Sequence, residues 1–293
     1  MNTVRFKQVD VFTHRRFKGN PVAVILEADG LTDAQMQQIA NWTNLSETTF
    51  VVSKTSDEAD YKVRIFTPGS ELPFAGHPTI GTAHALIEAG LVTPRSGVLT
   101  QECGAGLVKL DVTTDTLGAR RIAFELPTPK IITLTSEDID QLETSLGSPI
   151  LREFQPCLVD VGARWIVAQL SNAAAVLANR PDMEQVKIAS VRAQATGVVI
   201  FGEYTDEGPS DMEVRAYAPA CGVSEDPVCG SGNGAMAAFV RHTAQVEYFG
   251  EELQASQGQM LGRAGAIYLN IQTQSIKVGG EAITCVDGTV SLD

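Results

Sequence analysis

Short blocks of alternating apolar and polar residues, separated by turn residues, run through most of the chain. Near its start, the segments VRFKQVDVF (4–12) and PVAVIL (21–26) have the alternating, β-branched character of strands. A loop that contains Lys18, Gly19 and Asn20 joins them. The pattern therefore predicts a hairpin-like opening.

A helix and another strand are predicted next. Apolar residues that fall roughly on one helical face indicate the helix: Leu31, Met36, Ile39, Ala40 and Trp42. Thr32 is placed to act as its N-cap residue. The segment NLSETTFVVS (44–53) then leads from polar residues into a β-branched run. This pattern places Glu47 where a loop enters a strand.

A strand, a glycine turn and a helix occur in this order twice. The first copy, RIFTPGSELPFAGHPTIGTAHAL (64–86), and the second, RAYAPACGVSEDPVCGSGNGAMAAF (215–239), share Arg, Pro, Glu, Pro and Gly in the same order. Aligning Gly76 with Gly230 sets Ala75 opposite Cys229, with three residues inserted in the second copy. A further strand, VDVGARWIVAQL (159–170), is expected early in the second half.

The repeat and the length of 293 residues predict an α+β fold of two similar domains, 1–128 and 129–293. The last strand is the element that we expect to be able to cross to the first domain. Two helices that open at Gly76 and Gly230 would direct their N-termini toward one cleft, where amide groups and helix dipoles favour a carboxylate. A purely structural duplication is the simpler interpretation.

Titratable and nucleophilic side chains lie beside both glycines: His77, Asp226, Cys229 and Ser231. Each also has an ordinary structural explanation. Asp226 before a proline can form a turn, Ser231 can cap a helix, and a buried cysteine packs as a small hydrophobic residue. Position alone therefore leaves their role open.

Glu47 is the candidate for proton transfer, although a lone Glu in a polar loop is usually a solvated surface residue. Enclosure by apolar neighbours such as Leu45 and Phe50 would raise its pKa toward neutrality and suit it for general acid or base work. Its burial thus decides between the two interpretations.

Charge and composition narrow the function further. Lys and Arg number 22 against 35 Asp and Glu, and the net charge of −13 argues against nucleic acid as a partner. The first twenty residues lack the apolar stretch of a signal peptide, and no apolar run approaches the roughly 18 residues that span a bilayer. These observations predict a cytoplasmic protein without a membrane partner.

The cysteines and histidines give no sign of a metal site or a disulfide framework. Five cysteines without C-x-x-C spacing fit reduced thiols. The four histidines are scattered and show no zinc-binding spacing.

Four motifs carry a resemblance to a known family: GNPVAV (19–24), NLSETTFV (44–51), ELPFAGHPTIGTA (71–83) and EDPVCGSGNG (225–234). With these motifs in this order, the chain resembles the phenazine biosynthesis PhzF-like family. QGQMLGR (257–263) and VGGEAI (278–283) extend the resemblance to nearly the whole chain.

The resemblance implies a diaminopimelate-epimerase-like fold, in which each domain wraps a mixed β-sheet around a central helix and the active site lies between the domains. It also implies a homodimer that isomerises a small, cyclic or unsaturated carboxylate, similar to trans-2,3-dihydro-3-hydroxyanthranilate. A glutamate moves the proton in this reaction, and neither a metal nor an organic cofactor takes part.

Matching motifs carry the implied roles to single residues. Glu47 is the glutamate that moves the proton, and the other polar catalytic roles fall to His77, Asp226 and Ser231. The remaining expected site residues bind or line the substrate, with the two glycines supplying backbone amides to its carboxylate: Asn20, Gly76, Gly230 and Cys229.

Two other functions compete with this hypothesis. An amino-acid epimerase or racemase would use two opposed cysteines, but Ala75 stands opposite Cys229. A noncatalytic carboxylate-binding protein would need the amides but no proton-transferring glutamate.

Overall fold

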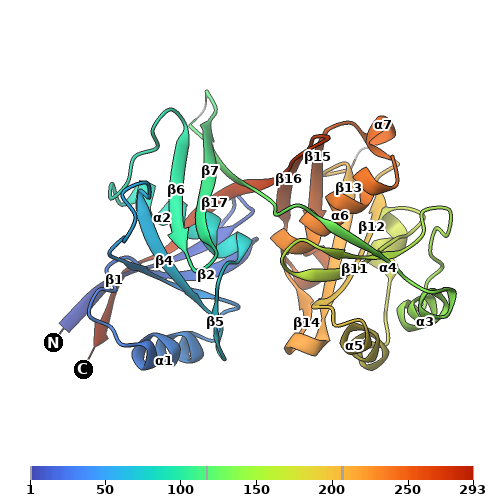
Figure 1. Ribbon diagram of the computed structural model, residues 1–293, viewed down its shortest axis with the longest axis horizontal. Coiled ribbons are helices and arrows are strands. Elements are labelled where there is room, and N and C mark those ends of the chain that lie inside the picture. The colour runs from blue at the N-terminus through green and yellow to red at the C-terminus, as the bar shows by residue number, and fades with distance from the viewer. Residues whose placement is uncertain (1, 117, 206–207, 293) are drawn as a thin grey trace. The chain divides into compact units, whose positions relative to one another are not determined.

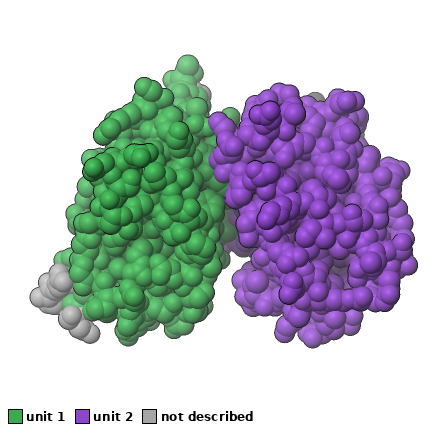
Figure 2. Space-filling model, in the orientation of Figure 1, with its two compact units in different colours: residues 1–124, 279–293 green, residues 125–278 purple. Residues whose placement is uncertain are grey.

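The computed structural model describes residues 2–116, 118–205 and 208–292. The chain forms two compact units, one of residues 1–124 and 279–293 and the other of residues 125–278 (Figure 2). The division expected from the repeat follows residue 128, whereas the internal contacts divide the chain after Phe124 and return it to the first unit at Gly279.

The first unit is a sheet that closes on itself. Its elements are, in chain order, β1 (Asn2–Val11), β2 (Asn20–Ile25), α1 (Asp33–Thr43), β3 (Thr48–Val52), β4 (Tyr61–Phe66), β5 (Glu71–Leu72), α2 (Gly76–Glu88), β6 (Val98–Cys103), β7 (Gly106–Thr114) and β8 (Arg120–Glu125). β1 is antiparallel to β2, β2 parallel to β3, β3 antiparallel to β4, β4 parallel to β6, and β6 antiparallel to β7. The last strand, β17 (Ile276–Leu292), pairs with both β8 and β1 and completes the closure.

The second unit repeats this order of pairings. Its elements are β9 (Lys130–Thr133), α3 (Ser136–Leu146), β10 (Cys157–Asp160), β11 (Arg164–Gln169), α4 (Ala173–Ala178), α5 (Met183–Arg192), β12 (Gly197–Glu203), β13 (Met212–Ala218), η1 (Pro219–Cys221), β14 (Val223–Asp226), α6 (Gly230–His242), α7 (Val246–Phe249), β15 (Glu252–Gln257), η2 (Gln259–Leu261) and β16 (Gly265–Ile271). β10 is antiparallel to β11, β11 parallel to β12, β12 antiparallel to β13, β13 parallel to β15, and β15 antiparallel to β16. The three residues inserted in the second copy lie between Pro219 and Glu225, in the segment where the chain forms η1.

One helix of 13 residues lies among the strands of each unit, α2 in the first and α6 in the second (Figure 1). Most residues of both helices are buried, so these helices lack a solvated face. A helix enclosed in this way needs small residues where strands approach it. A Cβ atom added at Gly81 would lie 2.4 Å from Val22 Cγ1, and one at Gly234 would lie 2.7 Å from Leu126 Cδ1.

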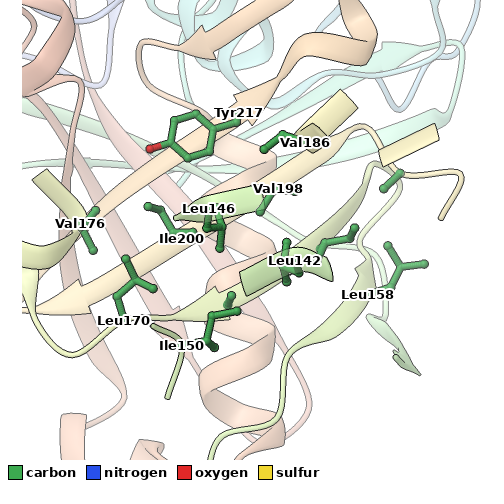
Figure 3. Close-up of a cluster of buried hydrophobic side chains, with 13 residues drawn as sticks. Leu142, Leu146, Ile150, Leu158, Leu170, Val176, Val186, Val198, Ile200 and Tyr217 are labelled. Carbon is green, nitrogen blue, oxygen red and sulfur yellow. The ribbon is translucent and has the colours of Figure 1, made fainter. Parts of the chain in front are cut away.

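The other long helices cover the outside of the strands. In the first unit, α1 buries Met36 and Ala40 against a cluster that includes Ile25 and Phe50. In the second unit, side chains from α3, α4 and α5 pack on those of β10 to β13, as Figure 3 shows. The prediction that Trp42 belongs to the buried face of α1 was wrong, because its side chain is 80% exposed.

Another expectation also needs correction. The segment VDVGARWIVAQL, predicted as one strand, forms parts of β10 and β11, which pair as an antiparallel hairpin. Gly162 has φ +98° at the turn between them, a backbone conformation that glycine adopts readily. Gly162 is a turn signal in the sequence, but the apolar residues on both sides of it favoured the prediction of one continuous strand.

The repeated Arg and Glu positions form equivalent ion pairs with different burial. Arg64 binds both carboxylate oxygens of Glu71, at 2.8 and 2.7 Å, and Arg215 binds those of Glu225, at 2.9 and 2.8 Å. The side chains of the first pair are 25% and 41% exposed, and those of the second are 6% and 8% exposed. The second pair therefore has far less access to water.

We predict that Glu225→Gln lowers the free energy of unfolding by about 3 kcal/mol, because it leaves a buried guanidinium without its counter-charge. The equivalent change Glu71→Gln at the more exposed pair should cost less than about 1 kcal/mol. Urea denaturation of both variants measures the difference. Equal losses would contradict this account of the second pair.

Candidate functional site

Glu47 directly precedes β3, where the loop after α1 enters the sheet. The N–H of Ala23 in the parallel strand β2 donates to the Glu47 carbonyl at 3.5 Å. The side chain of Glu47 is only 15% exposed. This carboxyl group is therefore largely withdrawn from water, unlike that of an ordinary surface glutamate.

His77 is the second residue of α2, and its Nε2 lies 3.4 Å from Oε2 of Glu47. Burial lowers the pKa of His77 to about 4, although a hydrogen bond with the backbone of Pro21 acts in the opposite direction. Pro21 offers only a carbonyl acceptor, so the imidazole must donate this bond. Because Nε2 faces Glu47, Nδ1 is the donor, and Nε2 presents its lone pair to the carboxyl group.

Buried hydroxyl and amide groups fix α2 to the strands around it. Thr82 on α2 donates to the hydroxyl oxygen of Thr49 on β3 at 2.8 Å, two residues after Glu47. Gln101 on β6 donates to the hydroxyl oxygen of Thr79 on α2 at 3.0 Å. These bonds hold the helix that carries His77 in register with the strand that follows Glu47.

The N-terminus of α2 has the character expected of an anion site. Ala75 is the N-cap residue and forms no side-chain hydrogen bond with the helix. The first-turn amides are therefore not capped by the side chain that usually covers them. Gly76 cannot gain a side chain without displacing the ring of Phe124, since a Cβ atom there would lie 2.6 Å from Phe124 Cζ.

The first unit thus brings four of the predicted residues onto neighbouring elements: Asn20, Glu47, Gly76 and His77. Asn20 is 1% exposed and begins β2, next to the Pro21 carbonyl that binds His77. The second unit carries the other four: Asp226, Cys229, Gly230 and Ser231.

Asp226 ends β14, and its Oδ1 accepts the N–H of Val228 at 3.1 Å. Burial raises the pKa of Asp226 to about 6, and the neighbouring charge of Glu225 acts in the same direction. Hydrogen bonds from Val228 and from the Cys229 thiol oppose this shift. The carboxyl group therefore titrates close to neutral pH.

Cys229 and Ser231 flank Gly230 at the start of α6. Cys229 is the N-cap residue, and its Sγ accepts the N–H of Gly232 at 3.3 Å. Burial and the nearby Asp226 hold the pKa of this thiol well above its usual range, so it stays protonated at neutral pH. Its position matches Ala75, the N-cap residue of α2, as the repeat alignment predicts.

Other side chains in these surroundings were missed from the sequence. Trp165 on β11 donates its indole N–H to Ser231 Oγ at 3.1 Å. Gln257 on β15 accepts from the backbone N–H of Cys229 at 3.0 Å and from the Asn233 amide at 2.8 Å. Gln257 opens the motif QGQMLGR, which was a usable signal, whereas Trp165 is an apolar residue in an apolar strand.

The described ranges contain neither a metal-binding cluster nor a helix suited to span a membrane. No group of three or more His, Cys, Asp and Glu side chains in them is arranged to hold a metal ion. None of their helices has the length and apolar character that crossing a membrane requires.

Comparison with known proteins places the chain among its relatives. The family model described as phenazine biosynthesis-like protein matches residues 9–288. The chain belongs to the phenazine biosynthesis-like family. It is 43% identical to the Schizosaccharomyces pombe protein named antisense-enhancing sequence 1, over 97% of each chain. It is 32% identical to trans-2,3-dihydro-3-hydroxyanthranilate isomerase of Pseudomonas chlororaphis, over 97% of this chain and 98% of the relative.

A solved structure of this phenazine biosynthesis-like family agrees with the fold. The Bacillus anthracis phenazine biosynthesis protein of the PhzF family superposes with a TM-score of 0.87 at 27% identity, and the match covers both chains completely. The resemblance stated from the motifs and the mixed α and β fold class are thereby confirmed. At the level of the family, the prediction of an isomerase agrees with the names of several relatives.

We predict that Asp226→Asn stabilises the protein above pH 6. The raised pKa means that the folded state favours the neutral acid, so this contribution to stability is complete below pH ~4 and is lost as the pH rises through about 6. Asparagine cannot ionise and avoids that loss, which for a shift of this size is about 3 kcal/mol at most.

Urea denaturation at pH 4 and pH 8 measures this effect, with the exposed Asp57→Asn as the matched control. The gain from Asp226→Asn should appear at pH 8 and vanish near pH 4. A variant that is less stable than the wild type at pH 8 would show that ionised Asp226 stabilises the fold.

Proposed function

We propose that this protein is an isomerase that moves a proton within a small, cyclic or unsaturated carboxylate, with Glu47 as the acid-base group. The observation that carries the proposal is the pair formed by Glu47 and His77, whose side chains are 15% and 8% exposed and 3.4 Å apart. Such a pair beside a helix N-terminus without a side-chain cap combines a proton donor or acceptor with a site for an anion.

The protonation state of His77 gives the pair its chemistry. With Nδ1–H donating to Pro21, Nε2 can accept a proton or a hydrogen bond from the carboxylic acid form of Glu47. The carboxylate form can then take a proton from carbon, and the acid form can return one to another carbon of the same substrate. An isomerisation needs both steps, and one residue can perform them in turn.

The second unit offers complementary groups. We propose that Asp226 and Ser231 also take part in the reaction and that the first-turn amides at Gly76 and Gly230 bind carboxylate. The pKa of about 6 for Asp226 leaves both of its protonation states accessible near neutral pH. Amide and hydroxyl donors aimed at developing negative charge stabilise the enolate-like species that proton removal creates.

These groups and the names of several relatives support the proposed substrate class. Several relatives are named isomerases, and that of Pseudomonas chlororaphis is named for trans-2,3-dihydro-3-hydroxyanthranilate. The latter compound is a cyclic, unsaturated carboxylate. It is the first compound to test, alongside simpler unsaturated carboxylates. The charge of −13 gives no support for extending the function to nucleic acid.

We predict that Glu47→Gln lowers turnover by about 10²- to 10⁴-fold, because glutamine keeps the shape of the side chain but cannot transfer the proton. The experiment incubates trans-2,3-dihydro-3-hydroxyanthranilate in heavy water and follows isomerisation together with deuterium incorporation. Glu58→Gln, at an exposed glutamate of the same unit, is the matched control and should match the wild type.

Undiminished turnover in Glu47→Gln would remove Glu47 from the mechanism. A wild-type protein that binds these carboxylates but never exchanges or isomerises them would favour the noncatalytic binding protein. Calorimetry on the same samples measures binding directly and therefore separates these two outcomes.

A two-cysteine epimerase mechanism is disfavoured by the equivalent N-cap positions. Ala75 stands where a second thiol would be required, and the raised pKa of Cys229 keeps that thiol protonated. We predict that Cys229→Ser keeps turnover within about threefold of the wild type, because a serine hydroxyl can also cap α6. Steady-state kinetics measure this, and complete loss of turnover in a folded Cys229→Ser protein would restore thiol chemistry.

A further inference from the structure

Trp165 occupies a tightly fitted position in the second unit. It lies on β11 with 2% of its surface exposed, opposite Gly197 on the parallel strand β12. A Cβ atom at residue 197 would lie 2.9 Å from Cζ3 of the indole and 1.9 Å from the Tyr217 carbonyl oxygen. The glycine thus provides the space in which the indole ring lies against its neighbours.

The hydrogen bond of the indole has a fixed direction. An indole N–H can only donate, so the 3.1 Å bond to Ser231 makes Oγ the acceptor. The single hydrogen of the serine hydroxyl must then point elsewhere. Cys229 Sγ lies 3.6 Å from Oγ, and this sulfur already accepts the Gly232 N–H at 3.3 Å.

We propose that Trp165 is a positioning residue that commits the Ser231 hydroxyl to donating its hydrogen bond to the substrate anion. This inference rests on the proposed function, in which Ser231 binds the substrate. A serine hydroxyl held by a buried donor has one acceptor site filled and a narrow range of rotation. It therefore meets an anion with less reorientation than a free hydroxyl would need.

The same bond explains why Trp165 is tryptophan and not another large apolar residue. Phenylalanine would fill most of the volume but would leave Ser231 Oγ without its donor. Removing one such hydrogen bond costs a factor of about 3 to 10. We therefore expect Trp165→Phe to lower kcat/KM for trans-2,3-dihydro-3-hydroxyanthranilate threefold to tenfold.

A double-mutant cycle separates positioning from a general structural effect. If Trp165 acts through Ser231, Trp165→Phe should have no further effect on kcat/KM in a Ser231→Ala background. An equal additional loss in that background would overturn the proposal. Trp42→Phe is the matched control, because Trp42 is the other tryptophan of the chain and is 80% exposed.

A spectroscopic test requires no substrate, and it does not depend on the folding of the Trp165 variant. With Trp42→Phe, the only remaining indole belongs to Trp165, so a ¹⁵N-tryptophan label gives one indole N–H resonance. Adding Ser231→Ala should shift that resonance upfield and speed its exchange with water, because the acceptor is gone. An unchanged resonance would refute the hydrogen bond on which the proposal depends.

The outcomes also distinguish this proposal from the proposed function. If Glu47→Gln abolishes turnover while Ser231→Ala and Trp165→Phe leave it intact, the isomerase stands and the role of Trp165 falls. If Glu47→Gln has no effect on turnover, the proposed mechanism is wrong, and the catalytic role of the hydrogen bond between Trp165 and Ser231 is rejected with it. A resonance shift in Ser231→Ala would then remain as a structural fact alone.

Discussion

Each unit of this protein depends on enclosing one whole helix within its strands, because both the core and the candidate site are built on that helix. Hydrophobic burial drives this arrangement, but the polar groups that enter the interior with the helix must find partners there. In the first unit, Thr79 on α2 is bound by Gln101, which also accepts a hydrogen bond from Tyr61. In the second unit, Asn233 at the aligned position on α6 is bound by Gln257. A glutamine on the equivalent strand, β6 or β15, therefore anchors each helix.

The same scaffold carries different chemistry in its two copies. Ala75 and Cys229 are both N-cap residues, but only the thiol reaches back to a helix amide. The next aligned pair after the glycines is His77 and Ser231, an imidazole beside a carboxyl group in one unit and a hydroxyl beside an indole in the other. The equivalent ion pairs of Arg64 and Arg215 hold the turn before each helix in place, so the side chains around the helix start are free to differ between the copies.

Sequence reasoning succeeded where one strong local signal decided the structure. The capping residue Thr32 and the helix openings at Gly76 and Gly230 correspond to α1, α2 and α6, because caps and glycines act within one turn of backbone. It failed at Trp42, whose apolar ring is exposed, because the helical pattern was read too broadly. It also could not find the indole bond to Ser231, since β11 and α6 are 66 residues apart at that contact and no local pattern connects them. The burial of Glu47 likewise depends on packing and could be posed from the sequence only as a condition.

Two of the candidate groups are buried at a cost to folding stability. Burial is the main cause of both pKa shifts. It lowers the pKa of His77 to about 4 and raises the pKa of Asp226 to about 6. Each shift opposes the charged form that water would favour at some pH, so each lowers the stability of the folded protein there. A duplicated scaffold that served packing alone would have no reason to keep a buried carboxyl group beside a proline, since an apolar residue would fit the interior at less cost. A buried imidazole and a buried carboxyl group near the two helix openings are groups that the proposed proton transfer can use.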